Sequence, residues 1–367
     1  MSWNTPTKRE NWPDIRTWLH ISRAITTRCA SGSRTRRGRT PVRTPKSNQG
    51  FQMTSPALLT LPSPGDLDSP LLEIGLDLTI YAERLSVPEW EAVLDIYRKY
   101  APADVWTKVK ASPDIGFSRL PAGNYINAPL SDGATFPFLH RIRHRTIRGW
   151  RTEFRIWDGK LSQSWSACIY RLAHQANEPE HAFYRFLFPW DTAPALVASL
   201  ANEVGKHIQY LSGHAGFCHL YDPYFKAAAF AQIFPWAKRY WAVDVEDLNA
   251  ALPFMHNGMK AISWLTFIGA KFLADPKLAR QRQSLKTIPG AVLKPCGSGA
   301  LLQLGEKPIL GDRHRREPEL ASYFTAGSLL DPVLLTDITE FEGPFAERAC
   351  TVDWIHRFAA PSAWTSA

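Results

Sequence analysis

The sequence predicts an α+β fold: a mostly antiparallel sheet flanked by several helices, in a single main domain that follows a disordered N-terminal extension. Two observations predict it. Segments rich in aromatic and β-branched residues follow one another as hairpins, and helical patterns interrupt them irregularly rather than one by one. With 367 residues, the chain is long enough to bury a sizeable core.

The first predicted elements are a strand, a helix and a group of three strands. Apolar and polar residues alternate over Leu71–Glu83, which is typical of a strand. Ser-Val-Pro-Glu from Ser86 supplies an N-cap, an early proline and a capping-box glutamate for a helix. Asp158-Gly159 is a hairpin turn signal. We therefore expect antiparallel neighbours at Thr146–Trp157, Gln163–Leu172 and Ala182–Phe188.

Later elements alternate in type. Thr192 should cap a second helix, which precedes a short strand at Gly213–Tyr221. A third helix, opened by Asp222-Pro223, should end before Pro235, because proline interrupts helical hydrogen bonding. The remaining predicted elements are a buried strand at Met259–Ile268, a short helix to about Leu278, a hairpin over Ala291–Leu310 and a helix over Glu317–Leu330.

Charge and composition predict three regions. Residues 1–64 form a disordered basic head and lead-in, residues 65–335 the α+β domain, and residues 336–367 a C-terminal tail. Residues 1–52 contain eleven Lys and Arg but two acidic residues, which accounts for the whole net charge of +9. An organellar transit peptide and an RNA-binding arm are alternatives for this head; we favour translation from Met53. The rest of the chain is formally neutral, which argues against a nucleic-acid partner.

No pattern in the sequence has the spacing of a catalytic or metal site. Gly297-Ser298-Gly299 lacks the third glycine and the Lys-Ser/Thr pair of phosphate-binding loops. The histidines His207, His214 and His219 with Cys218 match no zinc spacing. The five cysteines are scattered and form no CxxC pair, so we expect reduced thiols, as in cytoplasmic proteins. No apolar run is long enough to span a membrane. We expect no catalytic residue, no metal, no cofactor and no membrane partner.

Two alternative functions stay open. The segment Arg141–Arg155, with Trp150 interleaved, has the composition of a nucleic-acid-binding strand. A hydrolase with a dispersed site, using Cys218 or a histidine, would bring together residues that are distant in sequence.

Three segments of the second half follow one another in order: residues 258–269 (GMKAISWLTFIG), 299–305 (GALLQLG) and 307–315 (KPILGDRHR). They resemble IKGVNWLTLLG, GVVIQAG and PxLGDxNR of the type VI secretion system immunity protein family (TsiV-like). Residues 211–216 are similar to its LHGYAG segment, and Phe234-Pro235 with Asp244 and Asp247 to its FPGLDVDD stretch. The similarity covers about residues 72–335. Ser263 and His314 stand where the family has Asn, and Trp236–Ala242 is an insertion.

The resemblance implies a cytoplasmic bacterial immunity protein that binds a cognate toxin effector, and not an enzyme. Some relatives accompany nuclease effectors. We expect neutralisation by occlusion of the toxin. If the toxin is a nuclease with a basic substrate groove, carboxylates that imitate phosphates would bind it. The predicted partner-binding residues are therefore Asp244, Glu246 and Asp247.

Overall fold

The computed structural model describes residues 60–62, 70–83, 87–102, 105–106, 108–112, 151–158, 165–172, 181–315 and 320–367. All of them belong to one compact unit, Thr54–Ala367. The basic head predicted at residues 1–52, most of the lead-in to residue 64 and the first two thirds of Arg141–Arg155, residues 141–150, lie outside the described residues.

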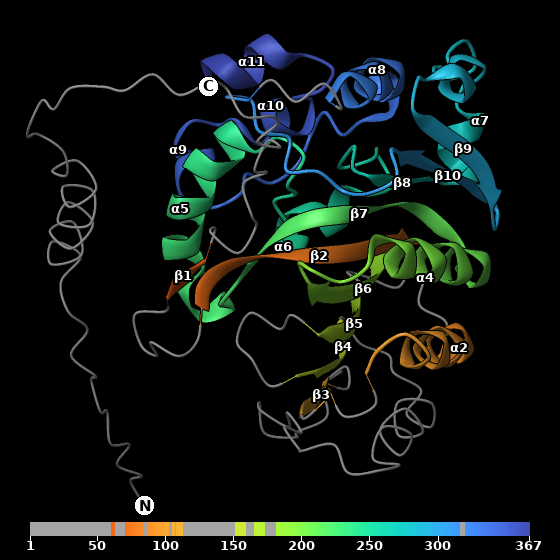
Figure 1. Ribbon diagram of the computed structural model, residues 1–367, viewed down its shortest axis with the longest axis vertical. Helices are drawn as coiled ribbons and strands as arrows, with labels where there is room; N and C mark the ends of the chain where they lie inside the picture. The colour runs from red at the N-terminus through yellow and green to blue at the C-terminus, as the bar shows by residue number, and fades with distance from the viewer. Residues whose placement is uncertain are drawn as a thin grey trace, which may run out of the picture. The chain divides into compact units, whose positions relative to one another are not determined.

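A ten-stranded sheet forms the centre of this unit, and every strand pair in it is antiparallel (Figure 1). The α+β prediction is confirmed. In spatial order the strands are β3 (Lys108–Ser112), β4 (Arg151–Trp157), β5 (Ser166–Leu172), β6 (His181–Pro189), β2 (Pro70–Ala82), β7 (Tyr210–Tyr221), β8 (Leu265–Ile268), β10 (Gly299–Leu304) and β9 (Ala291–Cys296). The short β1 (Leu61–Pro62) pairs with β2.

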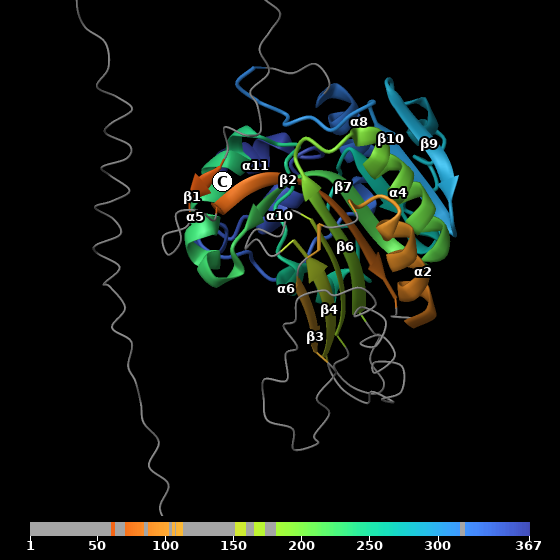
Figure 2. The same ribbon diagram turned by 60° about the horizontal axis from the view of Figure 1, so that its bottom comes forward.

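Helices cover both faces of the sheet. On one face, α2 (Val87–Arg98) and α4 (Pro194–His207) lie side by side (Figure 2). The core against the other face draws on α5 (Lys226–Arg239), α6 (Leu248–Ala251), α7 (Ala270–Ala274), α8 (Leu320–Leu330), α9 (Pro344–Glu347), α10 (Thr351–Ile355) and α11 (Pro361–Ser366). Short 3-10 turns occur at η2 (Pro223–Phe225), η3 (Leu252–Phe254), η4 (Ser284–Thr287) and η5 (Asp331–Val333). No helix in the described ranges is long and apolar enough to cross a membrane.

The central strand β2 separates two chemically different faces. Leu76, Leu78 and Ile80 are buried in the core that contains α2 and α4. Because successive side chains of a strand point to opposite faces, the residues between them point the other way. Those residues include Asp77 and Thr79, both fully buried. The alternation seen in the sequence therefore places polar groups inside the protein, beneath the second layer of helices.

The predicted end of the third helix before Pro235 is wrong. Helix α5 continues through Pro235 to Arg239. Proline removes one helical hydrogen bond, but the residues on either side of it hold the helix in place by packing. Phe234 lies 5.1 Å from Phe345 and 5.8 Å from Trp364 between ring centroids, and Ala237 is fully buried. Tertiary packing thus outweighs the local cost of the proline.

Two smaller predictions also need correction. The second helix has Ala193 at its N-cap, with no side-chain hydrogen bond, in place of Thr192. The strand predicted over Met259–Ile268 is shorter, since only Leu265–Ile268 pairs with the sheet. The residues before it leave the sheet, and one of them, Lys260, extends into the polar site described below.

Residues after the predicted domain end at 335 are part of the same core. They form α9, α10 and α11. Phe341, Phe345, Trp354 and Trp364 are each fully buried among the side chains of the α5 to α8 layer. The predicted C-terminal tail is therefore integral to the fold.

Candidate functional site

A row of polar side chains crosses the sheet on the face opposite α2 and α4. Residues that stand directly opposite one another on neighbouring strands point to the same face. The pairings run from β4 to β8 through Arg155, Cys168, Arg185, Thr79, His214 and Thr266. The register of the sheet therefore assembles this row from segments that are distant in sequence.

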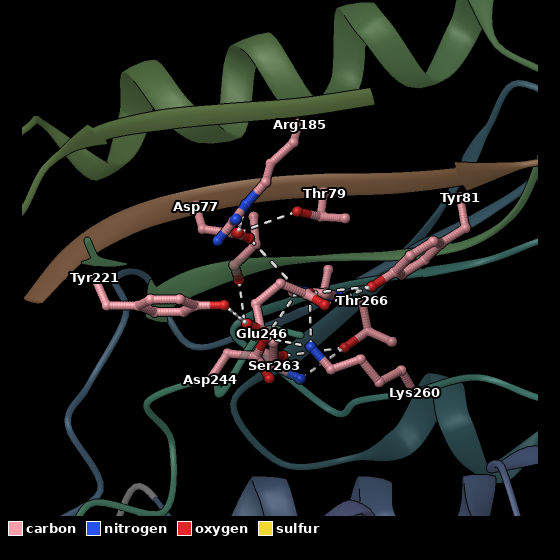
Figure 3. A network of polar contacts seen from close by, with 12 residues as sticks. Asp77, Thr79, Tyr81, Arg185, Tyr221, Asp244, Glu246, Lys260, Ser263 and Thr266 are labelled. Carbon is pink, nitrogen blue, oxygen red and sulfur yellow. Dashed lines mark hydrogen bonds and ion pairs between the residues drawn. The ribbon is translucent and has the colours of Figure 1, made fainter. Parts of the chain in front are cut away.

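Two acidic side chains, Asp244 and Glu246, approach the row from the segment between α5 and α6. The backbone of Asp244 is tied to the sheet, because its N–H donates to Phe217 O at 2.7 Å and its carbonyl accepts from His219 N at 3.1 Å. Lys260 Nζ donates to Asp244 Oδ2 at 2.7 Å and to Glu246 Oε2 at 2.6 Å (Figure 3). The Tyr81 hydroxyl also donates to Glu246, at 3.0 Å. This produces a buried charged network with one lysine between two carboxylates.

His214 completes the network. Its Nε2 lies 3.1 Å from Asp244 Oδ2, 3.3 Å from Glu246 Oε2 and 3.5 Å from Asp77 Oδ1. Burial by itself lowers the pKa of His214, but the neighbouring carboxylates raise this pKa to about 9. The imidazole is therefore protonated near neutral pH.

Charges within the network balance. Asp77, Asp244 and Glu246 carry three negative charges, and Arg185, Lys260 and protonated His214 carry three positive ones. Burial would raise the pKa of Asp244, but Lys260 and His214 hold it well below its usual range. A buried charge is tolerated only when it is paired in this way.

Asp77, His214 and Glu246 are the described residues whose ligand atoms lie close enough together to hold a metal ion. These three residues do not favour a metal ion, because the Lys260 ammonium already binds the same Glu246 oxygen that faces His214. With Arg185 and Lys260 present, a single proton on His214 neutralises the cluster, whereas a divalent ion would leave an excess positive charge. The network thus fits a proton better than a metal.

A cavity of about 370 Å³ adjoins the network and shares Arg185 and Glu246 with it. Strands β4, β5 and β6 supply one wall through the side chains that alternate with their buried apolar face. The end of β7 and the segment from η2 to α6 supply the other. The charged residues on the walls are Glu153, Arg155, Arg185, Lys226, Glu246 and Asp247.

The three predicted partner-binding residues do not form an exposed acidic patch. Asp244, Glu246 and Asp247 are only 3%, 1% and 3% exposed. Asp244 and Glu246 are paired with Lys260, and Asp247 is paired with Lys226 at 2.7 Å while its other oxygen caps α6. Glu246 and Asp247 do line the cavity. Their role in partner binding stays a prediction, and the cavity is the place where it could act.

Sequence reasoning missed most of the network: Asp77, Arg185, His214 as part of the site, and Lys260. A signal was present, since Lys260 stands alone among the apolar residues of a predicted buried strand, where an unpaired ammonium is strongly disfavoured. Such a lysine requires a buried carboxylate partner. The sequence does not say which carboxylate it is.

Cys218 and Arg155 lend no support to the two alternative functions. Burial raises the pKa of the Cys218 thiol well above its usual value, so this cysteine is not an activated nucleophile. In the described part of the Arg141–Arg155 segment, residues 151–155, Arg155 is paired with Glu153 at 3.1 Å on the cavity wall. This arginine is thus not in an open row of cations along a groove.

Comparison with known families identifies the chain. Residues 159–358 match the TsiV family profile, described as type VI immunity for VRR-NUC. Since this match covers more than half of the 367 residues, the chain belongs to the TsiV family of type VI secretion immunity proteins. The resemblance seen in the sequence is confirmed, and the match extends past residue 335 into the C-terminal helices.

A solved structure, described as Pseudomonas aeruginosa T6SS protein PA0821, has a similar fold. The two chains superpose with a TM-score of 0.66 at 18% sequence identity, covering 85% of this chain and 91% of that one. At this identity the similarity concerns the fold. No curated protein sequence matches the chain.

Proposed function

We propose that this protein binds a VRR-NUC nuclease effector in the bacterial cytoplasm and blocks its active site, so that the producing cell's DNA is protected. The observation that carries this proposal is the match of residues 159–358 to a family described as type VI immunity for VRR-NUC. Inhibition by occlusion needs a surface that keeps its shape, and a sheet with helices on both faces provides one. A stable complex of this kind buries about 1,600 Å² in total.

The prediction that Asp244, Glu246 and Asp247 bind the toxin by imitating phosphates enters this proposal in a modified form. Because Asp244, Glu246 and Asp247 are buried and already paired, they would act by holding the cations of the network and cavity in place. Direct contact with the toxin would then come from the side chains that line the cavity.

Complex formation tests the proposal. The partner to test is a VRR-NUC nuclease effector, used in a catalytically inactive form that can be purified safely. We expect the two proteins to co-elute in size-exclusion chromatography, and co-expression of this chain to restore growth to cells that express the active effector. An effector with a different toxin domain serves as the control. Separate elution together with unchanged toxicity would overturn the proposal.

A further inference from the structure

Three cations line the cavity, and each is paired with a buried carboxylate. Arg155 pairs with Glu153 at 3.1 Å, Arg185 with Asp77 at 2.8 Å, and Lys226 with Asp247 at 2.7 Å. The three cationic side chains are 24%, 14% and 21% exposed, whereas their carboxylate partners are 4%, 1% and 5% exposed. The cation is thus the more exposed partner in each pair, although Glu153 and Asp247 also line the cavity.

The Arg185 guanidinium has more N–H donors than its hydrogen bond to Asp77 uses. The hydrogen bond that the described residues give its guanidinium runs from Nε to Asp77 Oδ2. A guanidinium carries five N–H donors in a fixed plane, and its outer edge suits a planar carboxylate. Because Asp77 fixes the inner edge of the group, the outer edge is oriented before any ligand arrives. Lys226 is less available, because Glu342 also binds it, at 2.9 Å.

The remaining walls indicate an organic anion with a single charge. Tyr170 and Phe183 stack at 5.3 Å, and Leu187, Leu220 and Pro223 add apolar surface. A volume of about 370 Å³ lies in the range of pockets that take whole organic groups. Three cations and three carboxylates line the cavity, so one negative charge is tolerated better than the two of a phosphate. An aspartate or glutamate side chain has both the apolar stem and the single charge.

We propose that this cavity receives an acidic side chain of the effector, whose carboxylate is bound by Arg185 and Arg155. This inference rests on the proposed function and adds to it the site of contact and the chemistry of the partner group. The two arginines are then the anchors of the interface, and the buried carboxylates paired with them are positioning residues. A desolvated arginine anchor of this kind typically dominates binding energy.

The test is the affinity of the inactive effector for variants of this chain, measured by titration calorimetry. Arg185→Lys and Arg155→Lys keep the positive charge opposite Asp77 and Glu153 but lose the planar fork. We expect each to weaken binding by about 10-fold or more. Arg239→Lys is the matched control, because Arg239 forms a similar pair with Asp312, at 2.8 Å, away from the cavity. It should bind like the wild type.

A double-mutant cycle then locates the partner group. Single Glu→Gln and Asp→Asn variants of the effector are measured against the wild type and Arg185→Lys, and one of them should lose little further affinity in the Arg185→Lys background. Thermal unfolding of each variant confirms that the fold is retained. Should Arg185→Lys fail to fold, Arg155→Lys carries the test.

The outcomes separate the two proposals. If the wild type does not bind the effector, the proposed function fails and this inference fails with it. If the wild type binds and both cavity variants bind equally well, the inference alone is overturned. Butyrate, an organic anion with a single charge, and inorganic phosphate are tested in parallel. If either stabilises the wild type but not Arg185→Lys, while effector affinity is the same for both, the cavity binds a free anion and the inference is wrong.

Discussion

Lys260 Nζ lies 2.6 Å from Glu246 Oε2, and both side chains are shielded from solvent. Asp244 binds the same ammonium at 2.7 Å. Burial lowers the pKa of Lys260, but the two carboxylates outweigh this effect and raise it above its usual value. The lysine is therefore charged, and it joins the segment that contains Asp244 and Glu246 to the segment that leads into β8.

Removing this lysine should destabilise the protein strongly. Lys260→Met leaves Asp244 and Glu246 buried with one cation fewer, and breaking a buried ion pair in this way costs about 3–5 kcal/mol. Urea unfolding measures the loss. Lys286→Met, at an exposed position, is the control and should change the free energy of unfolding by less than about 0.5 kcal/mol. Equal small losses in both variants would contradict the described network.

Stability should fall as pH rises through the titration of His214. The pKa of His214 is about 9 in the folded protein, against 6.5 for an unperturbed histidine. A group with a raised folded-state pKa contributes fully below its unfolded pKa, and the contribution is lost as pH approaches the folded value. The free energy of unfolding should therefore decrease between pH 6.5 and 9. In His214→Gln this decrease should be smaller; an identical pH profile would show that His214 is not the titrating group.

The C-terminal helices should be required for folding. Trp354 is fully buried in the core of the α5 to α8 layer, so Trp354→Ala should cost about 3–5 kcal/mol. Trp190 is 37% exposed, and Trp190→Ala should cost much less. Chemical denaturation of the two variants compares them directly. Similar losses would mean that residues 336–367 are a dispensable tail, as the sequence-based boundary at 335 implied.

The sequence was informative about the fold and about the family because both depend on local patterns. Alternation over Leu71–Glu83 and the aromatic segments around β4, β5 and β6 predict the sheet, and β2, β4, β5 and β6 are indeed antiparallel neighbours. Packing contradicted local rules at Pro235 and at the C-terminal tail. In both places, aromatic side chains distant in sequence provide the stabilisation.

The candidate site was harder to predict from the sequence, because it is formed by contacts between residues that are distant in sequence. Asp77 and Arg185 are 108 residues apart, and Tyr81 and Glu246 are 165 residues apart. Asp244, Glu246 and Asp247 form a charge run in the sequence, but a charge run does not reveal whether it faces solvent. The structure buries it, because Lys260, His214 and Lys226 supply the opposing charges.

Cleavage of DNA by the purified VRR-NUC effector, with and without this protein, tests the central claim most directly. We predict that an equimolar amount of the protein abolishes cleavage, that raising the DNA concentration restores none of it once the complex has formed, and that the protein alone leaves the DNA intact. Undiminished cleavage in the presence of excess protein would contradict the account.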